Sequence, residues 1–197
     1  MDLQELKHFC LQKKYPIIRN EAANLLCKLV SEKNPREILE IGLCAGYSAS
    51  LLLSCCNGNL TSIEIDENRF IEAKENLKNM GFSSSRYNLI LGDACEILPK
   101  FSKNFDFVFL DGPKGQYANL LPYILDLLQE NGILVADNIG YFGKVASCDY
   151  SKKHRSAVKN LQSFLTALKQ NSNLETRFFD IDDGICVATK GIFTNGF

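Results

Sequence analysis

Three oxygen-bearing side chains follow apolar runs of the sequence, at points where strands of a sheet would end. Asp111 closes the run FDFVFL, and Asp137 and Asn138 close the run GILVA. The carboxyl ends of parallel strands meet at one edge of a sheet, so these oxygens would gather there. Such hard ligands favour Mg²⁺ or a similar divalent cation over zinc. Each aspartate could instead cap a helix or tie down a turn.

A glycine-containing turn follows an earlier apolar run, in the stretch EILEIGLCAGYS from Glu37 to Ser48. Gly42 and Gly46 would let the backbone approach a ligand, and the N–H groups of the next helix would suit a carboxylate or phosphate. The spacing is not G-x-G-x-x-G, which weakens a dinucleotide interpretation. A nucleoside with a charged tail fits this turn better.

Two acidic residues end the next two apolar runs. Glu64 stands twenty-two positions after Gly42, close to the spacing at which an acidic side chain accepts hydrogen bonds from ribose hydroxyls. It could instead be a solvated strand end. Asp93, in the stretch Gly92-Asp93-Ala94, could cap the next helix or lie in a turn that flanks an adenine.

These residues need an alternating strand and helix framework to bring them together. Apolar runs predict strands at Glu37–Ile41, Leu60–Ile65, Asn88–Leu91, Phe105–Leu110, Gly132–Ala136, Glu175–Asp180 and Ile185–Thr189. Helical periodicity predicts helices at Leu3–Lys13, Asn20–Ser31, Ser48–Cys55, Glu67–Met80, Cys95–Lys100, Tyr117–Leu128 and Arg155–Gln170. The rhythm indicates an α/β fold with a mostly parallel sheet and helices on both faces.

The last two predicted strands form a hairpin, because Asp182-Asp183-Gly184 supplies a turn that needs positive φ. An antiparallel pairing therefore closes the sheet. At 197 residues the chain predicts a single domain: amino-terminal helices in 1–34 that would cover the site, an α/β core in 35–190 and a loose tail in 191–197.

Composition excludes several classes of protein. Twenty-two basic and twenty-three acidic residues give a net charge of -1, which lacks the strong basic signal of many nucleic-acid binders. The amino terminus has no signal-peptide core, no segment could span a bilayer, and the eight cysteines form no C-x-x-C pair. We expect a cytoplasmic protein with reduced thiols, away from any membrane.

Four motifs, occurring together in order, carry a family resemblance. E-I-G-x-x-x-G-Y-S, L-G-D-A, F-L-D-G-P-K-G-Q-Y and V-A-D-N resemble the class I S-adenosylmethionine-dependent methyltransferases. More narrowly, they are similar to the metal-dependent O-methyltransferases that include the catechol and caffeoyl-coenzyme A enzymes. The resemblance covers about 16–190. It implies a Rossmann-like fold with a seven-stranded, mostly parallel sheet that contains one antiparallel strand.

The resemblance also implies roles for particular residues. Asp111, Asp137 and Asn138 would hold Mg²⁺ or another divalent cation, and Lys114 would be the general base. Protonated at neutral pH in water, this lysine would lose its proton more readily beside a metal ion and a sulfonium. S-adenosylmethionine would be bound by Glu40, Gly42, Gly46, Tyr47, Ser48, Glu64, Ile65, Gly92, Asp93, Ala94 and Asp111.

Metal chelation predicts an acceptor with two neighbouring oxygens, whose bound hydroxyl would ionise near neutral pH and attack the sulfonium methyl. P-I-I-R-N-E, K-G-Q-Y and the basic run Lys152–Arg155 look most like the bacterial branch that methylates 5-hydroxyuridine at the tRNA wobble position. The absence of tryptophan, with Pro113 beside the metal loop, suits a base on a large molecule. Phosphates could be contacted by Lys13, Lys14, Arg19, Lys152, Lys153, His154 and Arg155.

Two alternatives stay open. The same catalyst could act on a small catechol-like or caffeoyl-type molecule, or the chain could be a binding module without chemistry, against which the intact Asp111, Lys114, Asp137 and Asn138 argue. Our first prediction is a tRNA 5-hydroxyuridine O-methyltransferase. Relatives often pair, so a homodimer is expected.

Overall fold

The computed structural model describes residues 1–148 and 150–191. The chain forms two compact units, Met1–Ile97 and Leu98–Phe197. Of the predicted tail, only Gly191 lies within the described residues. It is buried and donates a backbone hydrogen bond to Asn173 O at 2.9 Å, so this residue is not loose.

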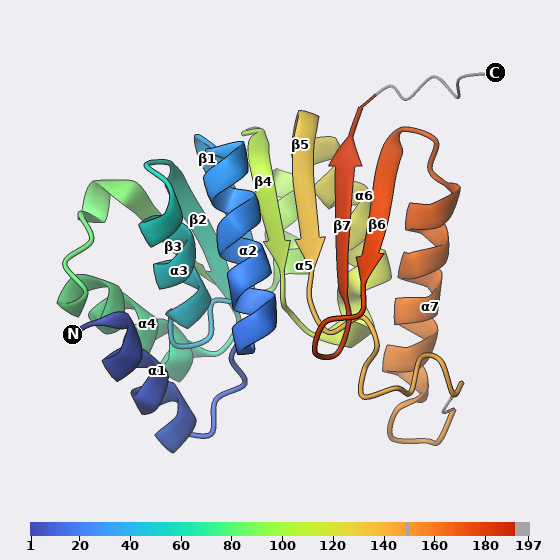
Figure 1. The fold of residues 1–197 in the computed structure, drawn as a ribbon, viewed down its shortest axis with the longest axis horizontal. Helices are drawn as coiled ribbons and strands as arrows, with labels where there is room; N and C mark the ends of the chain where they lie inside the picture. Colours follow the sequence, from blue (N-terminus) through green and yellow to red (C-terminus); the bar gives the residue numbers. More distant parts are fainter. Residues whose placement is uncertain (149, 192–197) are drawn as a thin grey trace. The chain divides into compact units, whose positions relative to one another are not determined.

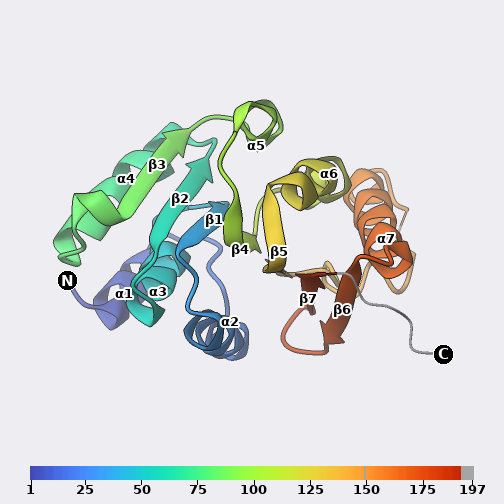
Figure 2. The same ribbon diagram turned by 90° about the horizontal axis from the view of Figure 1, so that it is seen from above.

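The first unit contains a parallel sheet with the strand order β3-β2-β1. In Figures 1 and 2, α2 and α3 lie side by side on one side of β1 and β2. The strands are β1 (Glu37–Ile41), β2 (Asn59–Glu64) and β3 (Tyr87–Leu91). The helices are α1 (Leu3–Gln12), α2 (Asn20–Lys33), α3 (Tyr47–Cys55), α4 (Glu67–Asn79) and α5 (Ala94–Ile97), with a 3-10 turn at Ser84–Arg86.

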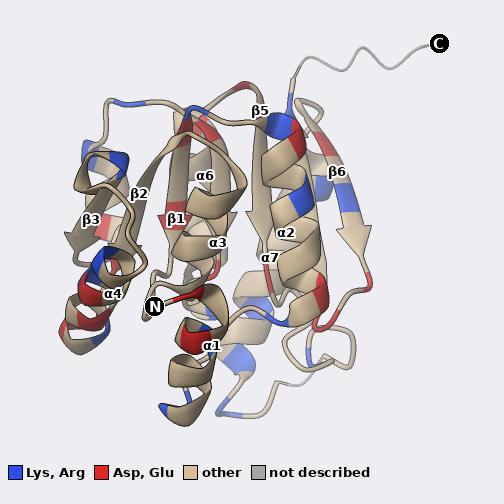
Figure 3. Ribbon diagram, turned by 60° about the vertical axis from the view of Figure 1, so that its left-hand side comes forward, with Lys and Arg blue, Asp and Glu red and all other residues tan. Residues whose placement is uncertain are grey.

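Local sequence explains where the first helices begin and end. Asp2 caps α1 in a capping box with Glu5, and Asn34 ends α2 in the left-handed region at φ 45°. Helix α3 is buried on nearly all sides, from Tyr47 to Leu53, because it packs between α1, α2 and the sheet. Acidic and basic side chains are mixed along α1 and α4 (Figure 3).

The second unit contains a mixed sheet with the strand order β4-β5-β7-β6. Strands β4 and β5 are parallel, and β7 is antiparallel to both of its neighbours. Helices α6 and α7 lie on one side of this sheet (Figure 2). The elements are β4 (Phe105–Leu110), α6 (Tyr117–Leu127), β5 (Leu128–Ala136), α7 (Arg155–Gln170), β6 (Leu174–Phe179) and β7 (Ile185–Lys190), with 3-10 turns at Leu98–Lys100 and Lys114–Gln116.

Buried aromatic residues form much of the core of this unit. Phe107 and Phe109 of β4 are fully buried, and the ring of Phe164 meets that of Tyr117 edge-on, with centroids 5.3 Å apart.

Strand β6 lies at the end of the sheet. It carries the ion pair between Arg177 and Glu175, and Lys169 lies 5.0 Å from the centroid of the Phe178 ring.

The predicted elements are confirmed, with two notable differences at their ends. The expected helix Cys95–Lys100 is divided into α5 and a 3-10 turn, since Pro99 lacks an N–H and disfavours helix at the preceding residue. Strand β5 begins at Leu128 instead of Gly132, with a register shift opposite Phe105 and Phe107. The expected hairpin turn forms, with positive φ at Asp182 and Gly184.

Among the described residues, no helix is long and apolar enough to cross a membrane. All eight cysteines are free thiols in the structure.

Candidate active site

The turn after β1 is held in a fixed shape by backbone hydrogen bonds. Gly42 and Leu43 both donate to Ile63 O, and left-handed backbone occurs at Gly42, Cys44 and Gly46. Gly46 precedes α3, and no side chain caps that helix start among the described residues. The first N–H groups of α3, including those of Tyr47 and Ser48, are therefore suited to an anion such as the carboxylate of a methionine.

Helix α4 braces the same turn. Asn76 donates to Ala45 O at 2.9 Å, and a Cβ at Gly46 would come within 3.4 Å of Ala73 Cβ. A Cβ at this distance would make ordinary van der Waals contact, so glycine at position 46 is favoured by its left-handed backbone, at φ 88°, and not by the approach of α4.

Glu64 ties the end of β2 to this turn. Its carboxylate accepts hydrogen bonds from the backbone N–H of Cys44 at 2.7 Å and of Ile65 and Asp66 at 2.9 Å. A carboxylate offers about four acceptor positions, so room is left for a ribose hydroxyl. Glu40 is fully buried and accepts from the hydroxyl of Ser62, its register partner on β2. Both cofactor roles stay predictions.

The turn after β3 shows what Asp93 does in the structure. Gly92 donates to Glu64 O, and Asp93 Oδ1 accepts from Cys95 N at 2.8 Å, so Asp93 caps α5. The helix-cap interpretation is confirmed, whereas the adenine contact of Gly92, Asp93 and Ala94 stays a prediction. Ile65 exposes 58% of its surface at the end of β2, an apolar patch of the kind an adenine ring could cover.

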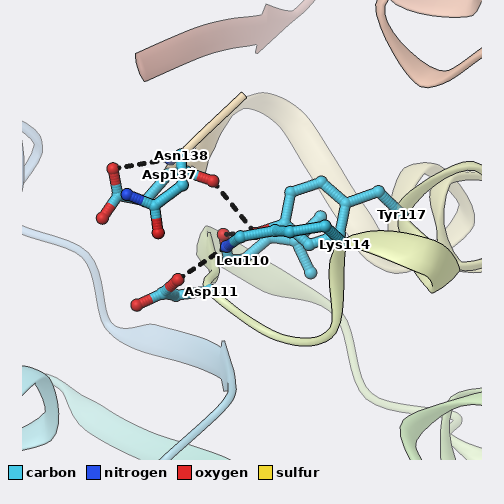
Figure 4. A network of polar contacts seen from close by, with 6 residues as sticks. All are labelled: Leu110, Asp111, Lys114, Tyr117, Asp137 and Asn138. Atoms are coloured by element: carbon cyan, nitrogen blue, oxygen red, sulfur yellow. Dashed lines mark hydrogen bonds and ion pairs between the residues drawn. The ribbon is translucent and has the colours of Figure 1, made fainter. Parts of the chain in front are cut away.

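In the second unit, the candidate metal ligands follow neighbouring strands in matched register. Leu110 of β4 and Ala136 of β5 are register partners, so Asp111 and Asp137 are the next residues on adjacent strands. Asp137 N donates to Leu110 O at 3.1 Å. Figure 4 shows the side chains of Asp111, Asp137 and Asn138 directed to one side of the network. The structure therefore brings together the three predicted donors.

A buried polar network connects these residues to Lys114. Lys114 Nζ donates to Asp111 Oδ1 at 2.8 Å and lies 2.6 Å from Tyr117 Oη. The Tyr117 hydroxyl is also 2.9 Å from Leu110 O and 3.1 Å from Asp137 O. One fully buried phenol thus joins Lys114 to the ends of both strands (Figure 4).

Burial and charge shift the pKa values in this network. Burial raises the pKa of Asp137 to about 6, with repulsion from Asp111 adding to the effect and Lys114 opposing it. Burial alone would lower the pKa of Lys114, but the nearby Tyr117 and Asp111 raise it overall. Lys114 is therefore a protonated partner of Asp111 in this structure. Its predicted role as a base requires that attraction to be weakened.

The donor set fits a hard divalent cation. Burial and the neighbouring Asp111 raise the pKa of the nearly fully buried Asp137, and added positive charge would favour its ionised form. No group of three or more His, Cys, Asp or Glu side chains among the described residues could hold a metal ion. The candidate site therefore depends on the amide of Asn138 as its third donor.

Two residues of this region were not predicted from the sequence. Tyr117 appeared only as part of the K-G-Q-Y motif, and Asp183 only as part of a turn. Asp183 Oδ1 accepts from Phe142 N at 2.7 Å, beyond the candidate ligand Asn138. Neither contact has a local sequence signal, because each joins residues from different elements.

Comparisons with known proteins identify the family. The O-methyltransferase family model matches residues 1–191. This chain belongs to that family. A catechol O-methyltransferase of Niastella koreensis is 30% identical over 157 residues, covering 77% of this chain and 68% of the relative.

Solved structures agree over nearly the whole chain. A Staphylococcus aureus protein, provisionally described as a caffeoyl-CoA O-methyltransferase, has a TM-score of 0.89 at 29% identity and covers 97% of this chain and 93% of its own. The O-methyltransferase TomG of Streptomyces achromogenes, solved with S-adenosylmethionine, has a TM-score of 0.85 at 23% identity, with coverages of 96% and 89%.

The predicted fold class is confirmed by these structures: a Rossmann-like methyltransferase fold with a mostly parallel, seven-stranded sheet. The predicted enzyme class, an S-adenosylmethionine-dependent O-methyltransferase, is confirmed by the family.

Proposed function

We propose that this protein transfers a methyl group from S-adenosylmethionine to one of two adjacent oxygens of a small catechol-like or caffeoyl-type molecule, with a divalent cation. The observation that carries this proposal is the meeting of Asp111, Asp137 and Asn138 beside Lys114 at the ends of β4 and β5. The named relatives favour this acceptor over the tRNA that we predicted first.

Each residue has a distinct task in this proposal. Asp111, Asp137 and Asn138 would hold the cation, which when bound supplies positive charge that favours ionisation of a chelated hydroxyl. Lys114 would accept the released proton, since added positive charge beside Asp111 lowers the pKa of the lysine. Tyr117 would hold the Lys114 amine in place through its 2.6 Å contact.

The first unit would hold the methyl donor. The turn Gly42–Gly46 and the start of α3 suit the methionine carboxylate, and Glu64 the ribose. These groups are already ordered by the hydrogen bonds of the turn. Little conformational entropy is then lost when the cofactor binds.

The test is transfer of labelled methyl from S-adenosylmethionine to a matched acceptor panel. Catechol and caffeoyl compounds should be methylated with Mg²⁺, whereas the corresponding monophenols should not. Chelation by EDTA should abolish transfer, and added Mg²⁺ should restore it. Equal methylation of catechols and monophenols, or full activity in EDTA, would contradict the proposal.

A second acceptor, 5-hydroxyuridine of tRNA, is favoured by one feature near Asn138. Phe142 exposes 69% of its surface, and Lys144 lies 5.8 Å from the centroid of its ring, a pairing suited to stacking on a base near phosphates. Lys152, Lys153 and Arg155 are also exposed, while His154 packs edge-on against Tyr141. Unmethylated tRNA added to the panel distinguishes the two acceptors, because only this one predicts label in RNA.

The predicted homodimer, the cytoplasmic location, the single domain and the covering of the site by residues 1–34 stay predictions. Light scattering of the purified protein would test the first of these.

A further inference from the structure

The segment that follows the candidate ligand Asn138 is fastened to the turn between β6 and β7. Ile139 N donates to Gly184 O at 3.0 Å, and Gly140 N donates to Asp183 O at 2.7 Å. Phe142 N donates to the Asp183 carboxylate at 2.7 Å. The Asn138–Phe142 segment is thus tied to the hairpin at three points, one of which is a side chain.

The Asn138–Phe142 segment and the hairpin approach so closely that glycine is required in each. A Cβ at Gly140 would come within 2.7 Å of Asp183 O, and a Cβ at Gly184 within 3.0 Å of Ile139 Cγ1. Real Cβ atoms essentially never come as close as the first distance. The contact therefore sets the path of the chain directly after Asn138.

The tied segment has an uncommon backbone conformation. Asn138, Tyr141 and Phe142 all have left-handed backbone, at φ 54°, 49° and 57°. Asparagine tolerates this region, but bulky aromatic residues rarely adopt it and need support from surrounding contacts. The hydrogen bond from Phe142 N to Asp183 supplies such support at the most exposed of the three residues.

One oxygen of the Asp183 carboxylate is in an unfavourable environment. Its Oδ2 atom is buried and has no hydrogen-bond partner among the described residues, whereas Oδ1 accepts from Phe142 N. A buried acceptor without a partner is unfavourable. An acceptor at Oδ1 alone suffices for the tether, so asparagine should replace aspartate here.

We propose that Asp183 is a positioning residue that holds the Asn138–Phe142 segment so that the amide of Asn138 is oriented as the third metal donor. The inference rests on the proposed function, since it concerns the same site. Without the Asp183 side-chain hydrogen bond, the left-handed backbone at Tyr141 and Phe142 loses its support, and only the backbone bonds of Ile139 and Gly140 still hold the chain after Asn138. Residues that orient metal ligands typically change metal affinity 10- to 100-fold when removed.

The test is a titration of the purified full-length protein with Mn²⁺, at a temperature where every variant is folded. Electron paramagnetic resonance measures the concentration of the free ion at each step. Asp183→Ala should weaken Mn²⁺ binding about tenfold. Asp183→Asn keeps the acceptor and should bind within about twofold of the unmodified protein. Asp180→Ala is the matched control, an exposed aspartate beside the same hairpin whose loss should leave binding unchanged.

Gly140→Ala is an independent variant whose added methyl group pushes the Asn138–Phe142 segment away from the hairpin. It should weaken Mn²⁺ binding as Asp183→Ala does. It also keeps the test decisive if Asp183→Ala does not fold. Unchanged binding in Gly140→Ala, or in a folded Asp183→Ala, would overturn the positioning role alone. Equal Mn²⁺ binding by the unmodified protein and Asp137→Ala would instead overturn the proposed metal site, and the inference with it.

Discussion

The two units hold their candidate ligand-binding residues by different physical means. In the first unit, Glu64 is satisfied by three backbone N–H groups, and the turn takes its shape from Gly42 and Gly46. In the second unit, burial disfavours the charge of Asp137 and raises its pKa, whereas Tyr117 and Asp111 favour the charged form of Lys114. The Glu64 carboxylate is therefore satisfied by hydrogen bonds, whereas the ionised form of Asp137 is unfavourable. The proposed function assigns a neutral polar ribose to the first region and a cation to the second.

The largest expected effect separates the two regions functionally. Asp137→Ala should reduce methyl transfer to catechols roughly 10³-fold, because a metal ligand worth several kcal/mol is lost. Binding of S-adenosylmethionine, measured by calorimetry, should change little. Asp126→Ala on the exposed face of α6 is the control. Loss of cofactor binding in Asp137→Ala would show that the regions do not act separately.

The converse change should damage the first region. Glu64→Ala leaves three backbone donors without their acceptor and should lower the free energy of unfolding by roughly 3 kcal/mol. Cofactor affinity should fall as well, because the turn loses its fixed shape. Thermal melts and calorimetry measure both effects, with Glu75→Ala on the exposed face of α4 as the control. A melting temperature equal to that of the unmodified protein would contradict this account of Glu64.

The raised pKa of Asp137 predicts that the stability of the protein depends on pH. Asp137 has a folded pKa of about 6, above its ordinary 3.8, so its contribution is favourable below pH 4 and is lost as the pH rises through 6. Asp137→Asn should therefore stabilise the metal-free protein at pH 7.5, by about 2 kcal/mol, and much less at pH 4.5. Thermal melts in EDTA at both pH values measure this.

Added Mg²⁺ sharpens that measurement. It should raise the melting temperature of the unmodified protein more than that of Asp137→Asn, because binding to the folded state stabilises it. The control Asp126→Asn should not be stabilised at pH 7.5, and its melting temperature should rise with Mg²⁺ as much as that of the unmodified protein. A stabilisation of Asp137→Asn that is the same at both pH values would rule out the buried Asp137 charge as its cause.

The smallest expected effect concerns Tyr117. Tyr117→Phe removes the hydroxyl 2.6 Å from Lys114 Nζ and should lower kcat about tenfold. Tyr117 is among the groups that raise the pKa of Lys114, so the acidic limb of the kcat profile should move to lower pH. Tyr123→Phe on the same helix is the control. An unshifted profile would mean that Lys114 is not the titrating base.

Sequence predicted the framework well because local patterns determine it. The strands that end at Asp111 and Asp137 are continuous apolar runs, and their matched register follows from parallel pairing. Other features depend on contacts between distant residues. The link of Tyr117 to Asp137 spans twenty positions, and that of Asp183 to Phe142 spans forty-one. No local pattern could reveal either.

Proline and turn chemistry explain the smaller differences. Pro99 ended a helix that periodicity alone would extend to Lys100, and Asp93 took the role of a cap, which the sequence had left open. The acceptor stays a proposal, since 5-hydroxyuridine of tRNA and catechols both offer adjacent oxygens.

The outer strand β6 affects how this protein behaves at high concentration. Among the described residues it pairs with β7 alone, so its other edge could recruit a strand from another molecule. Glu175 and Arg177 place charges there, and Lys169 lies over the ring of Phe178. Any incoming strand would have to strip water from these charged groups, which disfavours fibril-like association and helps to keep the folded chain dispersed.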